Sequence, residues 1–116
     1  MGEIVVKRVY EPADAADGFR ALVDRLWPRG VSKERAELDA WWKELAPSAE
    51  LRTAWHSEPD RFEEFAAAYR AELDAVDLAG ALDVIRFRDR VTLLFGSHDT
   101  ERNHAIVLRD YLLLRG

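Results

Sequence analysis

The stretch from Ala21 to Gly30 reads ALVDRLWPRG, and it predicts more about this chain than any other segment. Its first residues are apolar and suit a buried strand. The apolar run is then broken by Asp24 and Arg25, and it closes on a Trp-Pro-Arg-Gly turn. Ionised side chains at the edge of a core cost free energy of folding unless they pair with an opposite charge or serve in a functional site. A polar site is therefore expected where this strand meets its loop.

Three segments have the composition of strands, and helical segments separate or follow them. Residues 3–10 are short and β-branched, residues 19–26 form the second segment, and residues 90–96 are apolar enough for burial on both faces. The order strand, strand, helices, strand, helix predicts an α/β fold. We expect a small three-layer domain with a short, mostly parallel sheet of about three strands flanked by helices. No linker or repeat interrupts the chain, so residues 1–116 are expected to form a single domain.

Helices are expected in the middle of the chain. The apolar residues of 38–45, including Trp41 and Trp42, recur at helical spacing and predict a helix packed on the core. Ser48 and Ser57 are each placed to cap a following helix. The other predicted elements are a mobile or 3₁₀-like connection around 31–34 and helices over 82–88 and 101–114.

Composition excludes several classes of function. The 116 residues contain no cysteine, which removes disulfides, thiolate catalysis and thiolate metal sites. The formal net charge of −5 argues against electrostatic capture of DNA or RNA. No apolar run approaches the roughly 18 residues of a membrane span, and the first residues lack the pattern of a signal peptide. We therefore expect a cytoplasmic protein with no membrane-spanning segment.

The first candidate site lies where the second predicted strand ends. Ligands of parallel sheets bind beyond the carboxyl ends of the strands, and Arg8 would reach the same edge if the first two strands were parallel neighbours. Arg8, Arg25 and Arg29 would then form a cationic cluster, and guanidinium groups bind carboxylate or phosphate through paired hydrogen bonds. The alternative is structural, with Asp24 neutralising one arginine and Trp27 closing the end of the core.

The second candidate site is the turn GSHDTERNH, from Gly96 to His104, before the last helix. Gly96 permits close approach of a ligand, and free backbone N–H groups at a helix start favour anions. His98 or His104 could act as a general acid or base near neutral pH, and Ser97 and Asn103 would complete the ligand contacts. The alternative is that these residues only cap the helix and bind a neighbouring loop. The two histidines do not have the spacing of a metal motif, so no metal or cofactor is predicted.

Several segments together resemble the YeaO-like branch of the bacterial DUF488 family. The resemblance covers essentially the whole chain and implies a compact cytosolic α/β domain, but it supplies no activity. The most specific segment is LVDRLWPRG at residues 22–30. The others are KRVYEP at 7–12, DGFR at 17–20, Pro-Ser at 47–48 and Asn-His-Ala at 103–105.

The wider family carries a cysteine-rich version of the third strand that ends in a Cys-His-Arg triplet. Here Phe95 matches the earlier cysteine and residues 103–105 match the triplet, so only the histidine is present. The resemblance therefore implies no thiol or metal chemistry in this chain. It carries over His104 alone, while Asp24 and Arg25 match the family's Asp-x-Arg-like strand end less specifically.

The sequence leaves two functions of different classes open. The leading hypothesis is a site for a small anionic ligand, phosphate- or carboxylate-bearing, held by arginines with Asp24 and His104 as polar and titratable groups. As an enzyme, such a protein would be a hydrolase or group transferase that needs no metal. The alternative is a non-catalytic regulatory or interaction domain, and a nucleic-acid-binding regulator is its least favoured version. An exposed patch of tryptophans would favour a partner, and a pocket ringed by arginine and histidine would favour a ligand.

Overall fold

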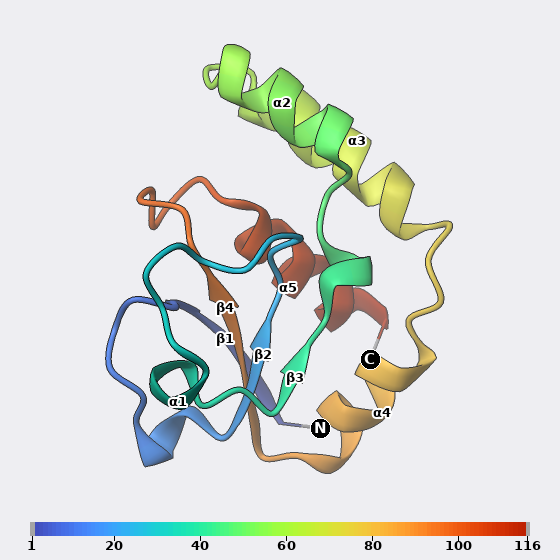
Figure 1. The fold of residues 1–116 in the computed structure, drawn as a ribbon. Helices are drawn as coiled ribbons and strands as arrows, with labels where there is room; N and C mark the ends of the chain where they lie inside the picture. The colour runs from blue at the N-terminus through green and yellow to red at the C-terminus, as the bar shows by residue number, and fades with distance from the viewer. Residues whose placement is uncertain (1, 116) are drawn as a thin grey trace.

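The computed structural model describes residues 2–115, and four strands form one fully parallel sheet (Figure 1). This architecture confirms the predicted α/β class, with one strand more than expected. Each of the two inner strands pairs with a parallel neighbour on both sides. The spatial order is β1 (Glu3–Arg8), β4 (Arg90–Phe95), β2 (Phe19–Leu22) and β3 (Ala40–Trp41).

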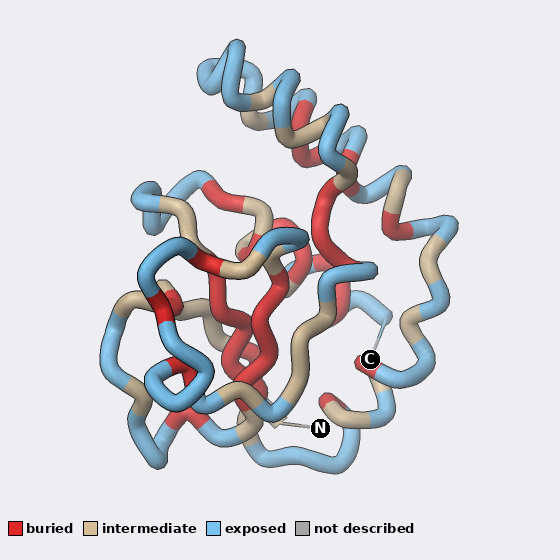
Figure 2. The backbone as a smooth tube through the Cα atoms, viewed as in Figure 1, coloured by how far each residue is buried: buried red, intermediate tan, exposed pale blue. Residues whose placement is uncertain are grey.

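Helices flank the sheet, and two of them extend away from it. Figure 1 shows α2 and α3 as a helical arm that projects from one end of the molecule. All nine residues of α2 keep some exposure to solvent, as Figure 2 shows. No helix within residues 2–115 is long and apolar enough to cross a membrane. The helices are η1 (Ala15–Asp17), α1 (Lys33–Ala36), η2 (Lys43–Leu45), α2 (Ala49–Ser57), α3 (Phe62–Leu73), α4 (Ala79–Phe87) and α5 (His104–Arg115).

Apolar clusters cover both faces of the sheet. The larger cluster joins Val91, Leu93 and Phe95 of β4 to side chains of α3, α4 and α5. The smaller cluster joins Leu94 and Leu22 to side chains around α1. Because successive residues of a strand face opposite sides, β4 contributes to both clusters. It is buried from Val91 to Phe95, as the sequence predicted.

The second strand ends earlier than predicted, and this early end creates the polar edge. The expected strand ran to residue 26, whereas β2 ends at Leu22. Val23 still donates its N–H to the Leu94 carbonyl at 3.0 Å. The next contact is made by a side chain, since the Gly96 N–H donates to Asp24 Oδ2 at 2.9 Å. The Asp24 carboxylate thus takes the place of a backbone acceptor where the strands separate.

The predicted helix over 38–45 is wrong. The segment instead forms β3 and then η2, and its two tryptophans pack in different clusters as strand neighbours do. Trp41 lies with the smaller cluster, and Trp42 stacks on Phe19 with ring centroids 5.8 Å apart. A short apolar run fits helix and strand spacing equally well, so pairing with β2 decides the outcome.

The cap predicted at Ser48 is confirmed, but the cap predicted at Ser57 is wrong. Ser48 Oγ accepts the Leu51 N–H at 3.1 Å and starts α2. Ser57 instead ends α2, where its hydroxyl donates to the Thr53 carbonyl at 3.2 Å. The connection predicted around 31–34 contains the start of a short helix, α1, capped by a serine. These differences move boundaries without changing the order of the main elements.

Candidate functional site

The carboxyl ends of β2 and β4 bring together Asp24 and His104, the two polar residues singled out from distant parts of the sequence. His104 begins α5, and its Nε2 lies 3.0 Å from Asp24 Oδ1. The same Nε2 lies 3.0 Å from the Val23 carbonyl oxygen. The Asp24 and His104 side chains are largely buried, with 20% and 12% of their surface exposed. One end of the candidate site is therefore a carboxylate–imidazole contact at the edge of the core.

The contacts of His104 fix which ring nitrogen carries its proton. Both groups next to Nε2 are acceptors, a carbonyl and a carboxylate, so Nε2 must carry hydrogen. The hydrogen-bond geometry favours the Val23 carbonyl. Asp24 Oδ1 lies equally near Nε2 but not along the direction of the N–H bond. This oxygen is buried and has no hydrogen-bond donor among residues 2–115. In the neutral ring Nδ1 then has the lone pair, and it is the atom that can accept a proton.

Two arginines form the other side of the site. Arg25 Nε donates to the Pro47 carbonyl and Arg25 Nη2 to the Ala46 carbonyl, both at 3.1 Å. A guanidinium has five N–H donors, so three remain for a ligand. Arg52 reaches the same place from α2. Together these groups enclose a cavity of about 90 Å³, lined by Asp24, Arg25, Ala46, Pro47, Arg52, Ser97 and His104.

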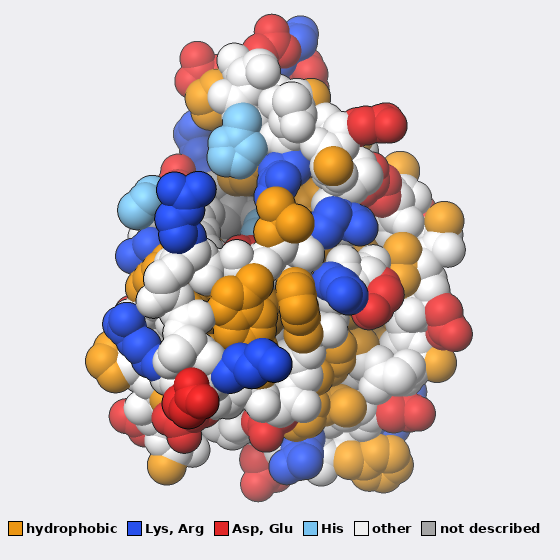
Figure 3. Space-filling model, in the orientation of Figure 1, with side chains coloured by type: hydrophobic (Ala, Val, Ile, Leu, Met, Phe, Trp, Pro, Cys, Tyr) orange, Lys and Arg blue, Asp and Glu red, His pale blue; other side chains and the backbone are white. Residues whose placement is uncertain are grey.

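The charge balance of this cavity, called here the Asp24 cavity, favours an anion. Within residues 2–115, no carboxylate oxygen lies within 4.0 Å of a guanidinium nitrogen of Arg25 or Arg52. Asp24 contacts His104 and does not neutralise an arginine, contrary to the structural alternative. Two fixed positive charges thus face one carboxylate. Figure 3 shows a hollow between the helical arm and the sheet, with Lys, Arg and His side chains at its rim.

A second layer of side chains holds this cavity in shape. Tyr69 of α3 donates its hydroxyl to the Leu45 carbonyl at 2.5 Å, and its ring meets that of His104 edge to face at 6.3 Å. Burial, helped by the nearby carboxylates of Glu72 and Asp24, raises the Tyr69 pKa well above its usual value. The phenol therefore stays a neutral donor. No local signal in the sequence identified Tyr69 or Arg52 as a site residue.

Arg8 lies one strand further from Asp24 than the sequence reasoning assumed. The condition for Arg8 to join the cluster, that β1 neighbours β2, is not met, because β4 lies between them. Arg8 Nε donates to the Ser97 carbonyl at 2.8 Å, and Nη2 lies 3.5 Å from His98 Nδ1 and from the Gly96 carbonyl oxygen. Arg8 thus secures the loop that carries Ser97, and the Asp24 cavity does not include it.

The remaining predicted site residues lie outside the cavity lining. Trp27 is half-buried, and its indole N–H donates to the Val31 carbonyl at 2.7 Å. The Arg29 side chain is exposed, and its backbone carbonyl accepts the Tyr10 hydroxyl. Asn103 is buried, and its Oδ1 accepts the Ile106 N–H at 3.1 Å at the start of α5. In this structure Asn103 acts as a helix cap.

Gly96 makes room for Asp24. A Cβ atom added at Gly96 would lie 2.8 Å from Asp24 Oδ2, closer than side chains pack. The close approach that this glycine allows is therefore occupied by a carboxylate of the same chain. The next residue, Ser97, lines the cavity.

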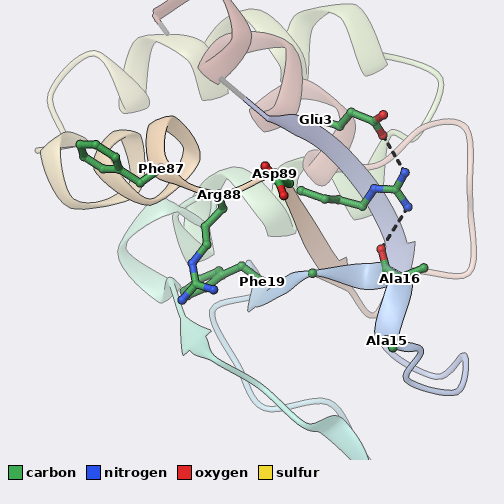
Figure 4. Close-up of a pocket in the computed structure, with 9 residues that line it drawn as sticks. Glu3, Ala15, Ala16, Phe19, Phe87, Arg88 and Asp89 are labelled. Atoms are coloured by element: carbon green, nitrogen blue, oxygen red, sulfur yellow. Dashed lines mark hydrogen bonds and ion pairs between the residues drawn. The ribbon is translucent and has the colours of Figure 1, made fainter.

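A larger hollow of about 720 Å³ lies at the opposite edge of the sheet, where the strands begin (Figure 4). Two of its charged groups, Arg90 and Glu3, pair with each other. Arg90 binds Glu3 and the Ala16 carbonyl, and the Arg88 guanidinium lies 5.2 Å from the centre of the Phe19 ring. Ligands of parallel sheets collect at the other edge, so we assign the site to the smaller cavity. Among residues 2–115, no three His, Asp or Glu side chains cluster as metal ligands would.

The fold and the site define a small α/β protein with a polar cavity at the carboxyl edge of a parallel sheet. The chain belongs to the DUF488 family: the family described as "Inactive DUF488-N3 subclade" matches residues 3–115. The uncharacterized protein YeaO of Escherichia coli K12 is 47% identical over 110 residues, covering 94% of this chain and 96% of that protein. These matches confirm the YeaO-like resemblance.

Mycobacterial relatives are also similar over nearly their whole length. Uncharacterized proteins of Mycobacterium tuberculosis H37Rv and Mycobacterium bovis are each 42% identical over 107 residues. Those alignments cover 92% of this chain and 91% of each relative. No solved structure matches the chain significantly.

Proposed function

We propose that the chain binds a small oxyanion, a phosphate or carboxylate group, in the Asp24 cavity. The observation that carries the proposal is the pair of guanidinium groups, Arg25 and Arg52, that face the cavity with no carboxylate of the described chain on either. Guanidinium groups bind oxyanions through paired, charge-assisted hydrogen bonds. Two further lining residues, Ser97 and His104, add polar groups around the ligand.

The size of the cavity agrees with a small anion. About 90 Å³ is several times the ~15 Å³ that one water molecule needs. It is well below the roughly 300 Å³ of sites that enclose a drug-sized ligand. An inorganic oxyanion, or the charged end of a larger molecule, is therefore the ligand that this cavity can surround.

We propose binding in preference to catalysis. His104 offers a basic Nδ1 in its neutral form, which is the one feature here that a hydrolase or transferase could use. The description of the matched subclade as inactive supports a binding role. Phosphate release from p-nitrophenyl phosphate tests the choice: turnover by the wild type that His104→Gln abolishes would favour catalysis.

Calorimetric titration with inorganic phosphate, and separately with acetate, tests the binding. Arg52→Ala is the sharpest variant because the Arg52 side chain makes no hydrogen bond or ion pair within residues 2–115. We expect it to weaken phosphate binding about tenfold, which corresponds to the loss of ~1.4 kcal/mol. Arg25→Ala should weaken binding at least as much.

The matched control is Arg86→Ala, which removes the same charge from an exposed position on α4. It should leave the dissociation constant unchanged at moderate salt, because exposed charges beyond a Debye length are screened. The proposal would be overturned if neither anion bound to the wild type. It would also be overturned if the Arg52 and Arg86 variants lost the same affinity for phosphate.

A further inference from the structure

The Asp24 cavity has room for an oxyanion but not for the molecule that carries it. Its volume of about 90 Å³ would hold one anionic group, so any attached organic part must leave the cavity. The lining of the cavity, which includes Ser97, His104 and the segment Ala46–Pro47, mixes polar and apolar atoms. The surface that continues from Asp24 and Arg25 is different, because it is apolar and partly open.

This apolar surface joins directly to the cavity wall. Leu26 follows Arg25 in sequence and has 59% of its surface exposed. The Trp41 indole N–H donates to the Asp24 carbonyl at 2.7 Å, so Trp41 lies against the residue that lines the cavity. Trp27 meets Trp41 edge to face, with ring centroids 5.5 Å apart. Both indoles are only half-buried.

A positive charge lies over part of the apolar surface. The Lys43 ammonium lies 4.7 Å from the centre of the Trp41 ring, and no carboxylate of residues 2–115 lies within 4.0 Å of it. Figure 3 shows hydrophobic side chains gathered below the hollow, with Lys and Arg side chains around them. An exposed apolar surface of this kind next to a polar cavity is typical of an extended ligand site.

We infer that the ligand is an oxyanion ester of an aromatic or similarly flat apolar group, such as an aryl phosphate or a nucleoside monophosphate. The oxyanion would lie between Arg25 and Arg52. The flat group would lie over Leu26 and Trp41 and displace the Lys43 ammonium from the Trp41 ring. Stacking on an aromatic side chain favours any ring with a π face. This inference rests on the proposed function, since it extends the same cavity.

The test compares three ligands by calorimetric titration: inorganic phosphate, methyl phosphate and phenyl phosphate. We expect phenyl phosphate to bind the wild type about tenfold more tightly than methyl phosphate, as one stacked ring allows. Adenosine monophosphate, as a fourth ligand, separates a nucleotide from a simple aryl ester. In the Leu26→Ser variant the phenyl-to-methyl preference should fall to about two- to threefold, and in Trp41→Ala it should fall close to one.

Inorganic phosphate separates the inference from the function on which it rests. Its affinity should be unchanged in Leu26→Ser, a variant that folds normally because Leu26 is exposed, and Leu114→Ser serves as the control at another exposed leucine. No phenyl preference in the wild type, or a preference retained in both the Leu26 and Trp41 variants, would overturn the inference while phosphate still binds. If no phosphate compound binds at all, the proposed function itself fails.

Discussion

Replacing Gly96 with alanine tests whether the Asp24 carboxylate is held as the structure shows. The added Cβ would lie 2.8 Å from Asp24 Oδ2, whereas ordinary contacts begin at about 3.4 Å. The carboxylate must therefore retreat by roughly 0.6 Å. Its 2.9 Å bond from the Gly96 N–H would then stretch beyond the usual length of such bonds.

The expected cost is about 1.5 kcal/mol. Weakening a hydrogen bond to a charged group lowers the free energy of unfolding by roughly 1.5–3 kcal/mol. Alanine offsets about 0.4–1 kcal/mol of this loss, because it restricts the unfolded chain more than glycine does. Gly96 does not have a positive φ, so alanine adds no backbone strain at this position. For a chain of this size the cost should lower the melting temperature by about 6 °C.

Urea unfolding of four variants measures this coupling. Gly80→Ala is the control, because a Cβ at Gly80 in α4 would meet nothing within 4 Å. It should leave the free energy of unfolding unchanged or raise it by up to about 1 kcal/mol. In an Asp24→Ala background the Gly96 substitution should no longer destabilise the protein. A Gly96 variant as stable as the wild type, or one that loses the same free energy of unfolding in both backgrounds, would show that Gly96 and Asp24 are not coupled.

Two further predictions concern the stability of the fold. Asp17→Asn leaves buried Arg20 without its carboxylate and should lower the free energy of unfolding by about 3 kcal/mol. Burial raises the pKa of Asp17, but hydrogen bonds, led by that from Lys7, lower it by more. The difference in free energy of unfolding between the wild type and this variant should therefore be complete above about pH 4. It should shrink as the pH falls through the lowered pKa of Asp17. An equal difference at pH 3 and pH 7 would contradict this prediction. Ser48→Ala removes the cap of α2 and a 2.6 Å hydrogen bond to Glu72. Chemical denaturation should show that the free energy of unfolding falls by about 1–2 kcal/mol. The Ser48→Thr variant should keep most of this stability.

Much of the fold could be predicted because local patterns and packing agree. The buried strand at 90–95 and the cap at Ser48 follow from composition and from a single hydroxyl. The strand at Ala40–Trp41 could not be predicted, because two adjacent tryptophans fit a helix as well as a strand until β2 is beside them. The order of the strands was also beyond local signals, since it depends on which long-range pairing buries more apolar surface.

The candidate site divides in the same way. Asp24 and His104 could be identified from charge at a strand end and from a histidine before a helix, and the structure brings them within 3.0 Å. Arg52 carries no local signal, because it enters the cavity only through the position of the helical arm. The structure uses Arg8 and Asn103 to hold loops and helix ends, a role that depends on backbone groups far away in sequence.

The most direct test of an oxyanion site at the carboxyl edge of the sheet is a ¹H–¹⁵N NMR titration with inorganic phosphate. We expect saturable shifts centred on Asp24, Arg25, Arg52, Ser97 and His104, together with shifts of the Arg25 and Arg52 side-chain N–H signals. The amides around the hollow at Phe87–Arg90 should stay unchanged. Shifts confined to that hollow, or no shifts at phosphate concentrations of tens of millimolar, would show that the Asp24 cavity is not an oxyanion site.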